Sequence, residues 1–193
     1  MEQSVTTLSI SEEVVRREWA DIDYAVKEKK LNEIMVNIGE CSFGKASDVL
    51  ICLGLGSCVA VVIYDLNLKI AGLAHVMLPS KDMGLSNSES STMTNKFADV
   101  AIPYLVDYML KAGCKKDSMR AKITGGAQMF RNINSDELFD IGRNNVLSVK
   151  EQLLNNDVCL ISEDIHGSEG RTMKFVVETS KAYVRTKSKI TLL

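Results

Sequence analysis

VLICLGLGSCVAVVIYDLNLKIAGLAHVML, residues 49–78, contains three apolar runs that predict β-strands. The first run, residues 49–55, is continuously apolar, which is typical of a buried strand. A Gly-Ser-Cys sequence separates it from the second run, residues 59–65. Asn-Leu-Lys then predicts a turn, and residues 70–78 return as the partner strand of a β-hairpin.

The order of the other elements predicts layers of sheet and helix. Strands are predicted at residues 34–40, 121–127, 157–164, 172–178 and 182–186. Helices are predicted over residues 144–155 and from about residue 97, where Pro103 predicts a kink or a later start. The inward face of the earlier helix is predicted to hold Phe97, Val100, Ala101, Tyr104, Leu105 and Tyr108. Alternation in residues 172–178 indicates a half-buried strand, with Lys174 on the polar side.

Strands that come in hairpins, with helices inserted between them, favour an α/β fold of the α+β type. We expect mixed, largely antiparallel β-sheet layers flanked by helices, in an αββα-like sandwich, plus an N-terminal helix. Residues 1–33 are interpreted as an N-terminal helical extension, and residues 34–193 as the main domain. The extension contains a predicted amphipathic helix over residues 10–30 that packs on its own domain or on a partner. Its apolar positions are Val15, Trp19, Ile22 and Val26.

Composition narrows the class of protein. The chain has 193 residues, of which 46% are hydrophobic and 25% charged, as is ordinary for a globular protein. Its formal net charge of −2 argues against a broad nucleic-acid-binding face. No stretch approaches the roughly 20 apolar residues of a membrane span, and the N-terminus lacks the pattern of a secretory signal. We expect a cytoplasmic protein with no nucleic-acid partner and no membrane insertion.

The cysteines do not form a recognisable framework. They are Cys41, Cys52, Cys58, Cys114 and Cys159. The odd number, the scattered spacing and the absence of a CxxC motif argue against disulfides and against a zinc site. A reactive thiol must therefore be recognised from its surroundings.

One candidate site is the break between the first two strands. Gly54 and Gly56 allow a sharp turn and the close approach of a substrate. Backbone amides around Ser57 and Cys58 could bind a developing oxyanion, and a nearby base could activate the Cys58 thiol. The alternative is an ordinary turn in which Cys58 belongs to the core.

His75 is the candidate base. The predicted hairpin places it near Cys58 across the strand pair, as a thiol–imidazole pair requires. The alternative is a histidine that is satisfied within the core. The other histidine, His166, lies in a glycine-rich turn and is interpreted as a surface residue.

Residues 49–61 and 71–79, VLICLGLGSCVAV and AGLAHVMLP, resemble the signature of CheD, a family of chemoreceptor glutamine deamidases. Four further segments follow in the family's order: NKFADVAI at 95–102, KITGGAQMF at 122–130, IGRNN at 141–145, and Glu163 to Arg171. The resemblance covers about residues 34–193. It implies a cysteine amidohydrolase that needs no metal or organic cofactor.

The resemblance also implies residue roles. Cys58 matches the family's nucleophile and His75 its base, while Cys52 stands six residues before Cys58, where the family has a threonine. A thiol is a weaker hydrogen-bond acceptor than a hydroxyl. A backbone carbonyl or the Ser57 hydroxyl would then orient His75, or the chain would act mainly by binding.

The implied substrates are glutamine side chains on the cytoplasmic helices of chemoreceptors. Gly125 and Gly126 are assigned with the Gly54–Ser57 turn to the oxyanion and substrate loop. The implied partner is a CheC-type phosphatase, with Met129 and Phe130 as candidate contacts, although Phe130 could equally lie in the core. Three rivals remain open: a non-catalytic adaptor for CheC or receptors, an unrelated thiol enzyme such as a peptidase, and a structural domain with a buried cysteine.

Overall fold

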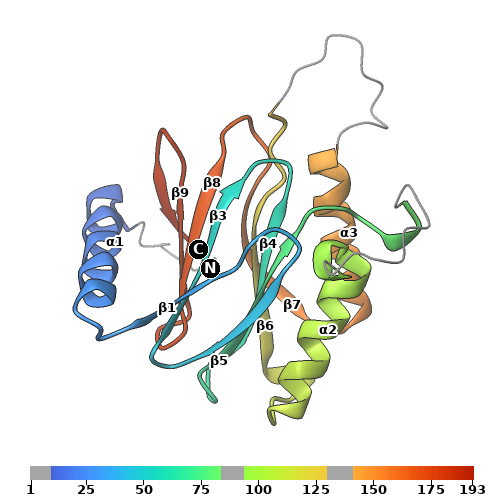
Figure 1. The fold of residues 1–193 in the computed structure, drawn as a ribbon, viewed down its shortest axis with the longest axis horizontal. Coiled ribbons are helices and arrows are strands. Elements are labelled where there is room, and N and C mark those ends of the chain that lie inside the picture. Colours follow the sequence, from blue (N-terminus) through green and yellow to red (C-terminus); the bar gives the residue numbers. More distant parts are fainter. Residues whose placement is uncertain (1–9, 84–93, 130–140) are drawn as a thin grey trace, which may run out of the picture.

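The chain folds into four layers, in which two β-sheets are stacked between helices (Figure 1). The structure is a computed structural model that describes residues 10–83, 94–129 and 141–193. The α-helices are α1 (Glu12–Lys27), α2 (Ala98–Lys111) and α3 (Ile141–Asn155), and one-turn 3₁₀ helices lie at Lys81–Met83, Thr94–Lys96 and Lys116–Ser118. The strands are β1 (Asn32–Met35), β2 (Cys41–Lys45), β3 (Asp48–Leu55), β4 (Val59–Asp65), β5 (Ile70–Val76), β6 (Met119–Gly125), β7 (Cys159–Ile165), β8 (Arg171–Val176), β9 (Lys181–Arg185) and β10 (Ile190–Leu192).

Both five-stranded sheets combine antiparallel and parallel pairs. The first sheet has the order β1-β3-β8-β9-β10, and the second has the order β2-β5-β4-β6-β7. The pairs β1–β3 and β6–β7 are parallel, and the other pairs of the described strands are antiparallel. The predicted αββα-like sandwich of mixed, largely antiparallel sheets is therefore confirmed. The predicted hairpin is β4–β5, in which Val59 pairs with Val76.

Apolar side chains fill the interfaces between the layers. Helices α2 and α3 pack on the second sheet through residues such as Leu105 and Val149. Leu50, Val62 and Phe175 belong to the cluster between the two sheets. Every residue of β4 is buried, as expected for a central strand that is covered on both faces.

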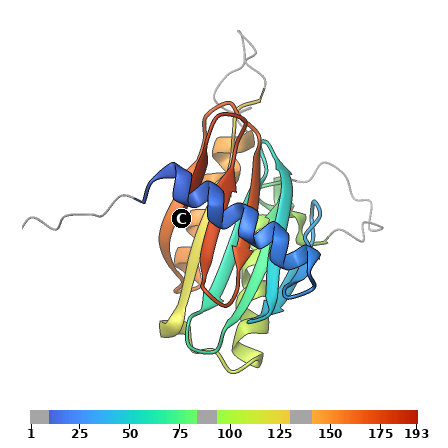
Figure 2. The ribbon, with the colours of Figure 1, turned by 90° about the vertical axis from the view of Figure 1, so that its left-hand side faces the viewer.

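Helix α1 covers the outer face of the first sheet, where it lies obliquely across the strands (Figure 2). Its buried residues are Val15, Trp19 and Ile22. Two cations lie close to the Trp19 ring, with Lys174 Nζ 4.2 Å and the Arg185 guanidinium carbon 4.7 Å from its centroid. The predicted amphipathic helix is therefore confirmed, and it packs on its own chain.

The prediction of a half-buried strand at residues 172–178 is wrong. Lys174 is only 7% exposed, because α1 covers the face to which it points. Its ammonium pairs with Asp23 of α1 and lies over the Trp19 ring, and both contacts stabilise the buried charge. A sheet face that appears polar in the sequence is thus an interior layer.

The single strand predicted at residues 34–40 is also wrong, because the chain turns between β1 and β2. The Glu40 carboxylate accepts hydrogen bonds from the backbone and side-chain amides of Asn37, at 3.1 and 3.0 Å. Gly39 has a φ of +75°, which favours glycine. Its N–H donates to the His75 carbonyl at 3.0 Å, so this turn is hydrogen-bonded to β5 at His75.

Helix α2 departs from its predicted inward face. Tyr104 and Tyr108 are 45% and 41% exposed and lie beside Phe43 of the edge strand β2, with ring centroids 5.8 and 3.4 Å from it. The buried residues are Ala98, Ala101, Ile102, Leu105, Val106 and Met109. The helix begins directly after Phe97, so Pro103 does not delay its start.

Candidate active site

The turn Gly56-Ser57-Cys58 carries the chain from the first sheet to the second, because β3 and β4 belong to different sheets. Cys58 is partly exposed and packs against the cluster between the sheets. Just before the turn, the β3–β8 pairing shifts by one residue between Cys52 and Leu55. Gly54 lies within this irregularity, is exposed and has a φ of +67°. The bulge ends the regular strand beside the candidate nucleophile.

Three donors hold the successive carbonyl groups of this turn. The Ala127 N–H donates to the Gly56 carbonyl and the Gly126 N–H to the Cys58 carbonyl, both at 2.8 Å. The Asn145 side-chain amide donates to the Ser57 carbonyl at 2.9 Å. The turn is therefore held in one conformation by the loop after β6 and by helix α3.

Gly125 and Gly126 contact the same turn. A Cβ atom on Gly125 would lie 2.1 Å from the Cys58 carbonyl oxygen, and one on Gly126 would lie 2.4 Å from Val146 Cγ2. Their φ angles are +123° and +65°. These glycines therefore allow the loop to approach the turn closely. The Gly126 N–H already donates to the Cys58 carbonyl, so it is not available to an oxyanion.

This close approach gives a first test. Gly125→Ala is expected to lower the melting temperature and to displace the Cys58 turn, because the added Cβ overlaps a backbone atom and the left-handed φ disfavours alanine. Thermal unfolding checks the first effect, and peptide-mapped alkylation of Cys58 checks the second. Gly113→Ala is the matched control, since Gly113 also has a positive φ but a Cβ there meets nothing within 4 Å. Equal effects of the two substitutions would contradict a steric role for Gly125.

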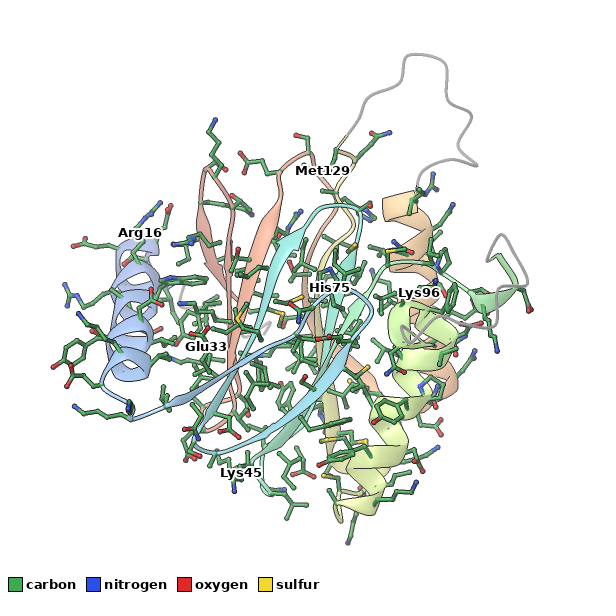
Figure 3. The ribbon with its side chains drawn as sticks, in the orientation of Figure 1. Arg16, Glu33, Lys45, His75, Lys96 and Met129 are labelled. Atoms are coloured by element: carbon green, nitrogen blue, oxygen red, sulfur yellow. The ribbon has the colours of Figure 1, made fainter. Side chains whose placement is uncertain are left out.

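His75 is a residue of β5 in the second sheet (Figure 3). Its side chain is on the same strand face as Ala71 and Leu73, which belong to the cluster between the two sheets. It pairs with Ala60, two residues after Cys58, and strand alternation places its side chain on the inter-sheet side together with Cys58. Such diagonal neighbours typically lie roughly 7–8 Å apart, with a somewhat shorter separation between their Cβ atoms. Neither ring nitrogen has a hydrogen-bond partner of good geometry among the described residues, although the Val36 backbone lies close enough to favour the protonated ring. The thiol and the imidazole are therefore neighbours without a direct hydrogen bond.

Burial keeps both groups neutral at rest. The His75 side chain is 1% exposed, and burial lowers its pKa below the ordinary value of 6.5, partly offset by the Val36 backbone. Burial raises the pKa of the Cys58 thiol, an effect opposed by its own backbone amide. The resting pair is therefore a thiol and a neutral imidazole, and a reaction would begin with proton transfer from sulfur to nitrogen.

Cys52 is buried in the same inter-sheet cluster. Burial strongly raises the pKa of its thiol, and the nearby Cys58 sulfur raises it further. The structure thus brings Cys52 into electrostatic reach of Cys58. Cys52 provides a neutral S–H group near Cys58.

The chain matches the model of the CheD family, described as CheD chemotactic sensory transduction, over residues 77–186. The chain belongs to the CheD family. The matched segment begins at Met77, just after His75.

CheD-family relatives match a longer stretch. A protein of Clostridium botulinum strain Hall, named probable chemoreceptor glutamine deamidase CheD, is 43% identical over 158 residues, covering 81% of this chain and 94% of the relative. A Bacillus velezensis protein named chemoreceptor glutamine deamidase CheD is 41% identical over 153 residues, covering 79% of this chain and 90% of the relative. Because the first match spans 158 of 193 residues, it includes the middle of the chain, where Cys58 and His75 lie.

Among solved structures, a Neisseria meningitidis protein of the DUF152 family is similar to this CheD-family chain with a TM-score of 0.41 and 12% identity. The match covers 84% of this chain and 74% of that one. Separately, none of the helices that the structure describes is both long and apolar enough to cross a membrane.

The partner-binding candidates of this CheD-family chain lie beside the turn or outside the described residues. Met129 is 46% exposed and packs on Gly56, where an added Cβ would be 3.0 Å from Met129 Cγ. Phe130 lies outside the described residues. His166 is exposed, which confirms that it is a surface residue.

Sequence analysis assigned no role to two features of this end of the fold, although both lie in segments that resemble the CheD family. The first is an ion pair between Arg171 of β8 and Asp164 of β7, with N–O distance 2.8 Å and side chains 6% and 8% exposed. It links the two sheets near the turn, because Arg171 pairs with Leu55. Burial opposes ionisation of Asp164, but the hydrogen bond and charge of Arg171 outweigh it and lower the pKa of the carboxyl.

The second feature is Asn145. Its side chain is fully buried on α3 and reaches the Ser57 and Met77 carbonyls. The IGRNN motif at residues 141–145 is a sequence signal that could have pointed to it.

Proposed function

We propose that this chain hydrolyses glutamine side-chain amides on chemoreceptors, with Cys58 as the nucleophile and His75 as the base. The names of its CheD relatives support the reaction and the substrate. The observation that carries the residue assignment is the placement of Cys58 and His75 on one side of the paired strands β4 and β5, with the thiol partly exposed at a turn. The reaction requires a nucleophile that a substrate can reach and a base on the same face.

In the proposed mechanism, His75 takes the proton of the Cys58 thiol, and the sulfur attacks the carboxamide carbon of glutamine. The carbonyl oxygen becomes an oxyanion that accepts hydrogen bonds from backbone amides at Ser57 and Cys58. The carbon–nitrogen bond then breaks, and protonated His75 gives its proton to the leaving ammonia. Water, deprotonated by His75, attacks the thioester, and glutamate and the free thiol are released. No metal or organic cofactor takes part.

The product replaces a neutral side chain with a carboxylate. On a receptor helix this change adds a charge that alters packing between helices. We place the reaction in the cytoplasm, where the signalling helices of chemoreceptors lie. We also propose binding to a CheC-type phosphatase, with Met129 and Phe130 as contacts.

Cys52 gives a test of how this chain orients its histidine. Cys52→Thr is expected to leave deamidation at least as fast as in the parent chain, because a hydroxyl is a better hydrogen-bond acceptor than a thiol and offers the His75 ring an acceptor in addition to the Val36 backbone. The rate of glutamate formation on a receptor fragment measures the effect. Cys114→Thr is a matched control, since Cys114 is also buried but packs in the cluster beneath α2 and α3. An inactive, folded Cys52→Thr variant would contradict this role of position 52.

A second candidate function is a binding adaptor with weak catalysis. The Cys52 thiol, which stands where the family has a threonine hydroxyl, favours it. Incubating a receptor cytoplasmic fragment with the chain, followed by mass spectrometry of its peptides, separates the two functions. Conversion of specific glutamines to glutamates supports the deamidase. Binding without conversion supports the adaptor and contradicts the proposed reaction.

A further inference from the structure

Asn145 connects the segment of the candidate nucleophile to that of the candidate base. Its Nδ2 group donates to the Ser57 carbonyl and to the Met77 carbonyl, both at 2.9 Å. Ser57 directly precedes Cys58, and Met77 follows His75 by two residues. One side chain from α3 therefore joins the Cys58 turn to the end of β5.

The orientation of this amide is defined by its partners. Carbonyl oxygens only accept hydrogen bonds, so the atom that contacts both of them must be the nitrogen. Oδ1 is buried and makes no hydrogen bond to the residues that the structure describes. Burying an unpaired oxygen is unfavourable, so this side chain gives up part of the stability that its two hydrogen bonds provide.

The bond to Ser57 also orients the next amide. A trans peptide is planar, with its C=O and N–H pointing in opposite directions. Holding the Ser57 carbonyl toward Asn145 therefore directs the Cys58 N–H away from α3. The same N–H is close enough to the Cys58 sulfur to lower the pKa of the thiol. An acyl carbon bonded to this sulfur would place its oxyanion beside the same N–H group.

We propose that Asn145 is a positioning residue of the deamidation site: through Ser57 it aims the Cys58 N–H at the oxyanion, and through Met77 it keeps the His75 strand in register with the turn. The proposal rests on the function proposed above. The proposed role of Asn145 is not to attach the helix to the sheet, because α3 already packs on the sheet through Val146, Val149 and Leu153.

A neighbouring contact provides a matched control. Ser148, one turn further along α3, donates its hydroxyl to the Pro79 carbonyl at 2.7 Å. This bond also links α3 to the segment after β5, but it does not reach the Cys58 turn. Ser148→Ala therefore removes a tether of the same helix and leaves the Ser57–Cys58 peptide in place.

The experiment compares the full-length wild-type chain with Asn145→Ala, Asn145→Ser and Ser148→Ala. Asn145→Ala is expected to reduce kcat on a receptor fragment by about 10- to 100-fold with little change in KM, because a small displacement of the reacting groups has that effect. Asn145→Ser keeps one donor and should recover part of the loss. Alkylation of Cys58 by iodoacetamide, followed by peptide mapping against pH, should shift to higher pH in Asn145→Ala but not in Ser148→Ala.

The outcomes are distinct. Unchanged kcat and an unchanged alkylation profile in Asn145→Ala, or equal losses in Ser148→Ala, would overturn the positioning role. A wild-type chain that deamidates nothing, but whose alkylation profile still shifts in Asn145→Ala, would support the positioning and reject the proposed reaction. If no Asn145 variant folds, hydrogen exchange of the wild-type Asn145 side-chain amide by NMR decides. Slow exchange supports the two hydrogen bonds of Asn145 to the Ser57 and Met77 carbonyls, and exchange as fast as in exposed asparagines overturns the positioning role.

Discussion

Cys58→Ala is expected to abolish glutamine deamidation, with a loss of about 10⁴-fold or more in kcat, because no other atom takes over the covalent step when a nucleophile is removed. The side chain is partly exposed at a turn, so the substitution leaves no large cavity and the variant should fold. Glutamate formation on a receptor fragment measures the loss. Binding of the same fragment should be retained.

Cys159→Ala is the matched control for Cys58→Ala. Cys159 is an exposed thiol at the start of β7, so its removal tests whether any accessible sulfur contributes to the reaction. We expect wild-type activity from Cys159→Ala. Substantial activity in Cys58→Ala, or a large loss in Cys159→Ala, would mean that the nucleophile lies elsewhere.

His75→Gln is expected to reduce kcat by about 10²- to 10⁴-fold, which is the usual contribution of a general base. The thiol of Cys58 has a raised pKa and therefore depends on a base to lose its proton near neutral pH. His166→Gln replaces an exposed histidine and serves as the control. A folded His75→Gln variant with wild-type kcat would exclude His75 as the base.

The pH dependence tests the same residue. Burial lowers the pKa of His75 below 6.5, so the base stays neutral, and the wild-type rate should persist, at pH values somewhat below 6.5. The rate should fall only at still lower pH, as the ring is protonated. A rate that already declines above pH 6.5 would instead indicate a histidine with a raised pKa and a preformed ion pair.

The shift of His75 also predicts how stability depends on pH. Above pH 6.5 the ring is neutral in the folded and unfolded states, so burial of the neutral His75 ring makes its full contribution to the free energy of unfolding there. Below pH 6.5 the unfolded chain takes up the proton first, and the free energy of unfolding decreases until the folded state is protonated as well. Urea unfolding at several pH values should therefore show less acid sensitivity in His75→Gln than in the wild type.

Local sequence pattern was sufficient for the hairpin that carries the candidate pair, but not for the turn between β1 and β2 that contacts His75. Continuous apolar runs on both sides of a short turn predicted the β4–β5 hairpin, and the register of this hairpin places His75 near Cys58. The sequence pattern did not predict burial correctly where an element distant in the sequence covers the residue. Lys174 appears solvent-exposed in a strand, but α1 buries it.

Asn145 illustrates the same limit within the site. Its importance arises because its side chain reaches from α3 to the residues just before β4 and just after β5, and no spacing in the sequence encodes the distance from Asn145 to Ser57 or Met77. The neutral state of the Cys58–His75 pair likewise depends on burial between two sheets, which residue order does not express. Sequence could name the candidate nucleophile and base, whereas the structure was needed to describe the groups that hold them.

Trapping the acyl intermediate tests the Cys58 assignment most directly. The wild-type chain is mixed with a glutamine-containing receptor fragment, quenched in acid within one turnover, digested and analysed by mass spectrometry. We predict a receptor peptide joined to the Cys58 peptide by a thioester, with loss of ammonia, and no such adduct in Cys58→Ala. Glutamate formation without an adduct at Cys58, or with an adduct at another cysteine, would contradict the assignment.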